Sequence, residues 1–178
     1  MNVKTVAQVI SLSAAAICLG AAPALADNPH CRQVGGGILT NFLDPSQCLP
    51  TTGSSVNLCT DGTATGDLRG AIGVQVLTVT PTATGLVLHN QHHWVTESGD
   101  TILLNPADAT AYATPDNNRF LGDYLSGIEI AGGTGAFEGA MGTIFAFGAV
   151  DLNLGQVTSG QVTLRYAGTV CFAHVPPP

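Results

Sequence analysis

Histidines are the residues of this sequence best suited to chemistry, and three of the five lie in the segment Leu88–Trp94 beside the only tryptophan. Imidazole side chains bind metal ions or transfer protons near neutral pH. On a β-strand, His89 and His93 share one face about 13 Å apart, while His92 points to the opposite face. One zinc ion about 2 Å from each nitrogen cannot bridge that distance. We therefore predict a solvated or hydrogen-bonded strand face here, with a contribution to a polar cavity as the alternative, and no metal site.

Carboxylates and nucleophilic side chains give weaker evidence of catalytic chemistry than the histidines. Asp123 and Glu129 fall on one strand face, six positions or roughly 20 Å apart, so they form no acid–base pair within that strand. The sequence contains no G-x-S-x-G segment, which would be typical of a nucleophilic serine. Hydrolase chemistry is therefore not predicted.

Aromatic residues are the better candidates for ligand contact. Tyr124 and Tyr166 each fall on the apolar face of a predicted strand, and a buried phenol needs a hydrogen-bond partner. A ligand, a backbone carbonyl or water at the rim of the fold would supply that partner. Phe145 and Phe147 share one face of another predicted strand. If a ligand is bound, we expect it to be apolar and small, and to contact some of Tyr124, Tyr166, Phe145 and Phe147.

The elements that position these residues are predicted to be β-strands. From residue 56 onward, short runs of Val, Thr, Ile, Leu and aromatic residues are separated by Gly, Pro, Asn and Asp about every 8 to 15 residues. Strands are predicted at 56–60, 67–80, 84–96, 101–113, 121–131, 142–152 and 159–172. So many strands in one domain must protect their edges, and closure into an antiparallel barrel over 56–173 does so most completely. A β-sandwich is the alternative.

The N-terminus predicts export. Residues 1–26 combine Lys4, an apolar run and "ALA" ending at Ala26, which is typical of a secretory signal peptide. The apolar run is shorter than the roughly 20 residues that cross a bilayer. We therefore expect a secreted or periplasmic protein. Residues 27–55, with three consecutive glycines, predict a loop-rich N-terminal arm, and residues 174–178 a flexible tail.

The charge of the mature chain excludes two classes of partner. Signal removal leaves four arginines against twelve acidic residues, a net charge of about −8 with histidine neutral. Binding to nucleic acids or to anionic lipid surfaces depends on basic residues that neutralise phosphates. Neither partner is expected, and no cofactor is predicted.

Four cysteines remain after signal removal: Cys31, Cys48, Cys59 and Cys171. An even number in an oxidising compartment predicts two disulfides, and the absence of a C-x-x-C pair argues against zinc. Three pairings are possible. Cys59 lies in the first predicted barrel strand and Cys171 in the last, and barrel closure places these strands side by side. We therefore predict a Cys59–Cys171 disulfide across the closure and a Cys31–Cys48 disulfide in the arm.

The segment "GGTGAFEGAMG" at 132–142 holds five glycines. A phosphate loop needs Lys and then Ser or Thr after its last glycine, and the dinucleotide fingerprint needs its third glycine three residues after the second. Neither pattern is present. We interpret the segment as a tight turn in which Gly132, Gly133, Thr134 and Gly135 end a strand and Phe137 closes one end of the barrel.

The stretch "IEIAGGTGAFEGAMG" at 128–142 resembles the hallmark turn of the allene oxide cyclase and dirigent barrel superfamily, approximately G-G-T-G-x-F-x-x-A-x-G. "CTDGTATGDLRG" at 59–70 and "LRYAGTVC" at 164–171 extend the similarity more weakly. Met141 stands where dirigent proteins usually carry an arginine. The resemblance implies an eight-stranded, calycin-like antiparallel barrel with an apolar cavity, commonly assembled as a trimer. Plant members cyclise an unstable fatty-acid epoxide or direct the coupling of phenoxy radicals.

Two functional hypotheses follow. The first is a non-catalytic exported barrel that binds an apolar small molecule or serves as a stable module, and it expects a cavity without paired titratable groups. The second is an isomerase, cyclase or dirigent-like protein that folds an apolar substrate in the cavity, and it expects a carboxylate or phenol that points inward. We favour the first, because no acidic residue is placed by pattern on an apolar strand face.

Overall fold

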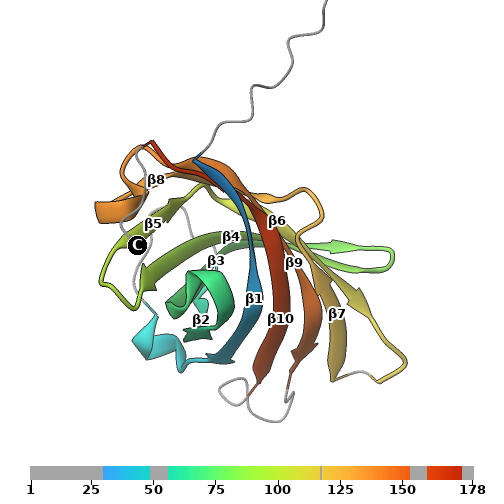
Figure 1. Cartoon of the computed structure of the whole chain (residues 1–178). Helices are drawn as coiled ribbons and strands as arrows, with labels where there is room; N and C mark the ends of the chain where they lie inside the picture. The colour runs from blue at the N-terminus through green and yellow to red at the C-terminus, as the bar shows by residue number, and fades with distance from the viewer. Residues whose placement is uncertain (1–29, 49–55, 117, 153–159, 174–178) are drawn as a thin grey trace, which may run out of the picture.

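The chain folds into a closed antiparallel β-barrel, which confirms the predicted fold class (Figure 1). The computed structural model describes residues 30–48, 56–116, 118–152 and 160–173; the predicted signal peptide and C-terminal tail lie outside them. The described part contains β1 (Cys31–Phe42), β2 (Leu58–Ala64), β3 (Gly70–Thr82), β4 (Gly85–Thr96), β5 (Thr101–Leu104), β6 (Ala107–Ala113), β7 (Arg119–Asp123), β8 (Ile128–Gly133), β9 (Met141–Asp151) and β10 (Gln161–Cys171), with 3₁₀ turns η1 (Pro45–Gln47), η2 (Gly66–Leu68) and η3 (Gly135–Phe137).

The ten strands occupy eight positions around the barrel wall, which we call staves, because two of these positions are each filled by two short strands in succession. β5 and β6 both pair with β4, on successive parts of its length. β7 and β8 both pair with β9 in the same way. The interrupted staves correspond to the segments predicted as single strands at 101–113 and 121–131. β10 pairs with β9 on one side and with β1 on the other, which closes the barrel.

The first stave lies where the sequence predicted a loop-rich arm. β1 pairs with β10 along nearly its whole length, and with β2 on its other side. The three glycines of this segment allow close approach rather than a loop: a Cβ on Gly36 would lie 1.9 Å from the carbonyl oxygen of Thr65. The predicted arm at 27–55 and barrel start at 56 are therefore corrected, because residues 31–42 belong to the barrel.

The disulfides are Cys31–Cys171 and Cys48–Cys59. All four cysteines are in disulfides as predicted, but the predicted pairs Cys59–Cys171 and Cys31–Cys48 are wrong. The cause is the unrecognised β1. β1, and not β2, is the strand that closes on β10, and its Cys31 lies directly opposite Cys171.

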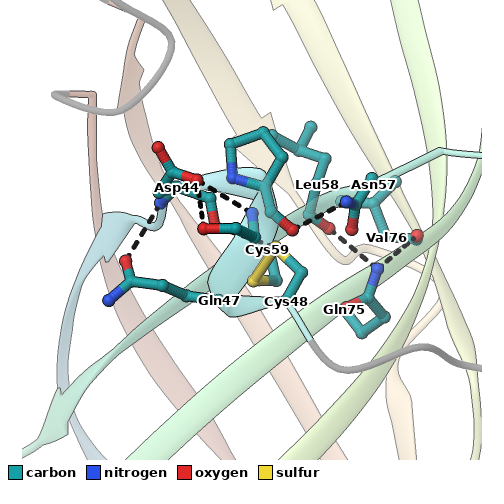
Figure 2. The surroundings of a disulfide bond; sticks show 10 residues. Asp44, Gln47, Cys48, Asn57, Leu58, Cys59, Gln75 and Val76 are labelled. Atoms are coloured by element: carbon teal, nitrogen blue, oxygen red, sulfur yellow. Dashed lines mark hydrogen bonds between the residues drawn. A yellow bond between two sulfur atoms is a disulfide. The ribbon is translucent and has the colours of Figure 1, made fainter.

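The second disulfide fastens the connection between β1 and β2 (Figure 2). Asp44 caps η1: its carboxylate accepts a hydrogen bond from the backbone nitrogen of Ser46 at 2.8 Å, and its own backbone nitrogen donates to the Gln47 carboxamide at 3.2 Å. On β3, the Gln75 carboxamide donates to the carbonyl oxygen of Leu58 at 3.1 Å. This end of the barrel is held by covalent and polar contacts.

The opposite end of the barrel is a solid core, which η2 covers. Leu68 in this turn is 1% exposed. Trp94 Nε1 donates to the Leu68 carbonyl oxygen at 2.8 Å. The Tyr166 hydroxyl accepts from the Leu68 nitrogen at 2.9 Å and donates to the Thr65 carbonyl oxygen at 2.9 Å. The Trp94 and Tyr166 rings meet edge to face with centroids 5.4 Å apart, so the turn is clamped by two aromatic side chains.

The glycine-rich segment 132–142 forms a turn at this same packed end. Gly135 has a φ of 54°, and a Cβ there would lie 1.9 Å from Asp100 Oδ1. Phe137 is 4% exposed and packs against Phe172 with ring centroids 5.4 Å apart. The segment therefore connects β8 to β9 and contributes Phe137 to the core.

Tyr166→Phe is expected to lower the free energy of unfolding by about 2 kcal/mol, because the Leu68 amide would stay buried and lose its acceptor. Urea unfolding at pH 7 measures the change. The matched control is Thr163→Val, which removes an exposed hydroxyl on β10 and for which a change of less than about 0.5 kcal/mol is expected. Equal effects of the two substitutions would show that the Tyr166 hydroxyl does not hold the turn.

Candidate functional site

The half of the barrel away from the packed core encloses a cavity of about 220 Å³. It extends toward the end where β1, β3, β6 and β9 finish and β2, β4, β7 and β10 begin. All eight staves contribute side chains to its wall, and most of these are aliphatic or aromatic. Toward the barrel end the wall consists of half-buried apolar side chains, namely Leu58, Val79, Leu86, Phe120, Leu152 and Val162.

Strand β4 supplies polar residues to this apolar wall. Its side chains alternate, so that every second residue from Leu86 to Trp94 lines the cavity. Within that inward row Asn90 and His92 replace apolar residues, and they are only 3% and 4% exposed. Asn90 was not predicted as a site residue. For His92 a solvated or hydrogen-bonded strand face was predicted, and the structure instead fits the alternative, a contribution to a cavity. The signal that would have found them is two adjacent polar positions in the inward register of an otherwise apolar strand face.

Tyr124, in the link between β7 and β8, completes a buried cluster that we call the Asn90–His92–Tyr124 triad. The Tyr124 hydroxyl accepts from Asn90 Nδ2 at 2.8 Å and lies 3.0 Å from His92 Nε2. The His92 and Tyr124 rings meet edge to face, with centroids 5.2 Å apart. The triad therefore joins the interior face of β4 to the interrupted stave on the other side of the cavity.

Burial keeps the two titratable members of the triad neutral at pH 7. Desolvation, followed by the charge of neighbouring His93, lowers the pKa of His92 to about 4. Desolvation also raises the pKa of Tyr124, against the smaller opposing effect of its hydrogen bond from Asn90. A neutral imidazole and a neutral phenol can each donate or accept a hydrogen bond. The triad can thus bind a neutral polar group or exchange a proton with one.

The structure separates the four predicted ligand-contacting residues. Tyr124 lines the cavity, as proposed from its apolar strand face. Tyr166 lies in the packed end, where its hydroxyl is engaged by backbone groups. Phe145 and Phe147 are 46% and 61% exposed on the outer face of β9, because Ala146 between them is the residue that faces inward. Of the four predicted residues, only Tyr124 lines the cavity.

The remaining histidines of β4 lie outside the cavity. His89 Nδ1 is 2.7 Å from Asp108 Oδ1 on the barrel exterior, and His93 is exposed. Within the described ranges, no group of three or more His, Cys, Asp or Glu side chains is arranged to hold a metal ion.

No family model, curated protein or solved structure matches this chain. None of the helical segments in the described part of the chain is long and apolar enough to cross a membrane. The geometry of the cavity and its triad is therefore the basis for assigning a function.

Proposed function

We propose that this protein is an exported barrel that binds an apolar small molecule in its cavity. The observation that best supports binding is that all eight staves contribute to an apolar cavity wall, which carries one polar cluster. An engineered apolar cavity of about 150 Å³ binds benzene. A cavity of about 220 Å³ suits a molecule of one ring with short branches.

Export is supported by the signal-peptide pattern of residues 1–26 and by the two disulfides, since disulfides form and persist in oxidising compartments. We propose that the mature chain begins at Asp27 and is secreted or periplasmic. N-terminal sequencing of the exported protein tests this proposal. A mature protein that retained residues 1–26 would contradict it.

Native mass spectrometry and displacement of a hydrophobic dye test the binding function. Ala109 lines the cavity and is 8% exposed, so Ala109→Leu fills part of the space. We expect this variant to bind the dye at least about tenfold more weakly than the wild type, because a filled cavity excludes the ligand. Ala131→Leu, the same change at an exposed position of β8, is the matched control and is expected to bind normally. Equal binding by both variants would place the dye outside the cavity.

The His92–Tyr124 pair favours a second candidate function, an isomerase or cyclase, because the simple binding hypothesis expected no paired titratable groups. A neutral imidazole can take a proton from a bound substrate, and a phenol can donate a hydrogen bond to an oxygen that gains charge. The enclosing wall would hold the substrate in one folded conformation.

The two candidates differ in what happens to the bound molecule. Isomerisation and cyclisation conserve mass, so an enzyme would convert the natural ligand into a second compound of the same mass with a different chromatographic retention time. Prolonged incubation of the ligand extracted from the exported protein tests this. A single unchanged compound supports binding alone, and conversion by wild type but not by His92→Gln supports the enzyme.

We also propose, on the family resemblance, that the protein assembles from copies of its own chain, most simply as a trimer. Support comes from an outer apolar patch on β6, β7 and β9 with the adjoining link, comprising Tyr112, Leu121, Leu125, Phe145 and Phe147, each at least 39% exposed. Tyr112 lies opposite Leu121 across paired strands, so the patch is continuous between β6 and β7. Exposed apolar patches commonly mark protein–protein contacts.

Light scattering is expected to give a mass near three chains for the wild type and near one chain for the double variant Leu121→Ser/Phe147→Ser, because two serines remove the apolar contact. Leu103→Ser, at an exposed leucine of β5, is the control and is expected to retain the wild-type mass. A wild-type mass of one chain would reject the assembly.

A further inference from the structure

The triad has hydrogen-bonding capacity that the protein does not use. Asn90 Oδ1 and His92 Nδ1 are buried and have no hydrogen-bond partner among the described residues. Both side chains belong to the cavity wall. Because an unpaired buried polar atom costs free energy, native proteins seldom leave one without a function or a partner.

The unused capacity includes a donor and an acceptor in either tautomer of His92. If the Tyr124 hydroxyl donates to Nε2, then Nδ1 carries the proton and remains a donor, while Asn90 Oδ1 remains an acceptor. If Nε2 donates to the Tyr124 oxygen instead, the phenol proton is the unused donor, and Nδ1 and Asn90 Oδ1 are acceptors. A ligand group that both donates and accepts therefore pairs with one unused donor and one unused acceptor of the triad in both cases.

We propose that the ligand of the cavity is an apolar alcohol, with a body of about one ring and a hydroxyl group that hydrogen-bonds the Asn90–His92–Tyr124 triad. The proposal rests on the binding function proposed above and specifies its ligand. A hydrocarbon leaves the donor and the acceptor unpaired. A ketone, whose oxygen only accepts, leaves Asn90 Oδ1 unpaired.

The charges around the cavity argue against a carboxylic acid as the ligand. No lysine or arginine is among the residues that line the cavity. His92 stays neutral at pH 7 because of its burial. A carboxylate ligand would lose its hydration without gaining a cation. The other polar wall residues include Thr40 and Thr60, whose rotating hydroxyls suit several ligand groups and discriminate less.

The dissociation constants of menthol and p-menthane test the proposal, because the two molecules share a ring and branches and differ by one hydroxyl. Trp94 is the only tryptophan and lines the cavity, so its fluorescence reports occupancy. The apolar triple variant Asn90→Leu/His92→Leu/Tyr124→Phe removes every polar atom of the triad's side chains. The ratio of the two constants, compared between wild type and variant, cancels the different hydration of the ligands.

We expect the triple variant to shift that ratio at least about tenfold in favour of p-menthane. His93→Leu, on the outer face of β4, is the control and should leave the ratio unchanged. Menthone provides a second measurement on the wild type alone: it should bind about tenfold more weakly than menthol, because it cannot donate.

The possible outcomes distinguish a failure of the alcohol assignment from a failure of the binding function. If the triple variant keeps the wild-type ratio, or if wild type binds menthol and menthone alike, the alcohol assignment is overturned while the binding cavity stands; ordered water that already serves the triad would give this result. If neither menthol nor p-menthane binds to the wild type, the proposed binding function fails, and the alcohol assignment fails with it.

Discussion

Replacing Cys31 and Cys171 together by alanine is expected to lower the free energy of unfolding by up to about 5 kcal/mol. The disulfide joins residues 140 positions apart, so its loss releases nearly the whole barrel to a larger unfolded ensemble. It also lies on the pair β1–β10, through which the barrel closes. Urea unfolding of the exported protein measures the change.

The matched control is the double variant Cys48→Ala/Cys59→Ala. Its disulfide spans only 11 positions, so the same chain-entropy argument gives up to about 3 kcal/mol. The variant without the Cys31–Cys171 disulfide is therefore expected to be the less stable of the two. The reverse order would show that the β1–β10 contact is not what limits unfolding.

Acidification from pH 7 to pH 4 is expected to remove about 3 kcal/mol of stability through His92 alone. The pKa of His92 is about 4 in the folded protein, whereas an exposed histidine titrates near 6.5. Between these values the unfolded chain binds the proton and the folded chain does not, so protons favour unfolding. Stability is therefore expected to be constant above about pH 6.5 and to fall as the pH drops toward 4.

Unfolding free energies of wild type and His92→Leu across this pH range isolate the contribution of His92, because the carboxylates titrate in both proteins. The wild-type curve should fall more steeply, by about 3 kcal/mol in total. Parallel curves would mean that the His92 side chain is hydrated in the folded protein, which contradicts its burial in the cavity wall.

The barrel could be predicted from alternation, because strands such as β10 bury one face and expose the other. β1 could not, since its three glycines carry no side chains that alternate. The need for glycine at residue 36 arises from the nearby Thr65 backbone, which is a tertiary contact. Missing that strand also made the disulfide prediction wrong, because the pairing argument assigned its place on the closure to β2.

The site was predictable in part. The apolar strand face around Tyr124 correctly suggested an inward phenol. Alternation placed Phe145 and Phe147 on one face but could not tell which face is inward, and the small Ala146 proved to line the cavity. The contacts of Tyr124 with Asn90 and His92 span 34 and 32 positions, so they depend on how the barrel brings β4 and the β7–β8 link together.

A crystal structure of the exported protein grown with menthol tests the central claim most directly. We expect one menthol molecule inside the barrel, with its ring against the apolar wall and its hydroxyl within hydrogen-bond distance of Asn90 or His92. A barrel whose interior is filled by repacked side chains, with menthol absent from it, would contradict the claim that this cavity is a binding site.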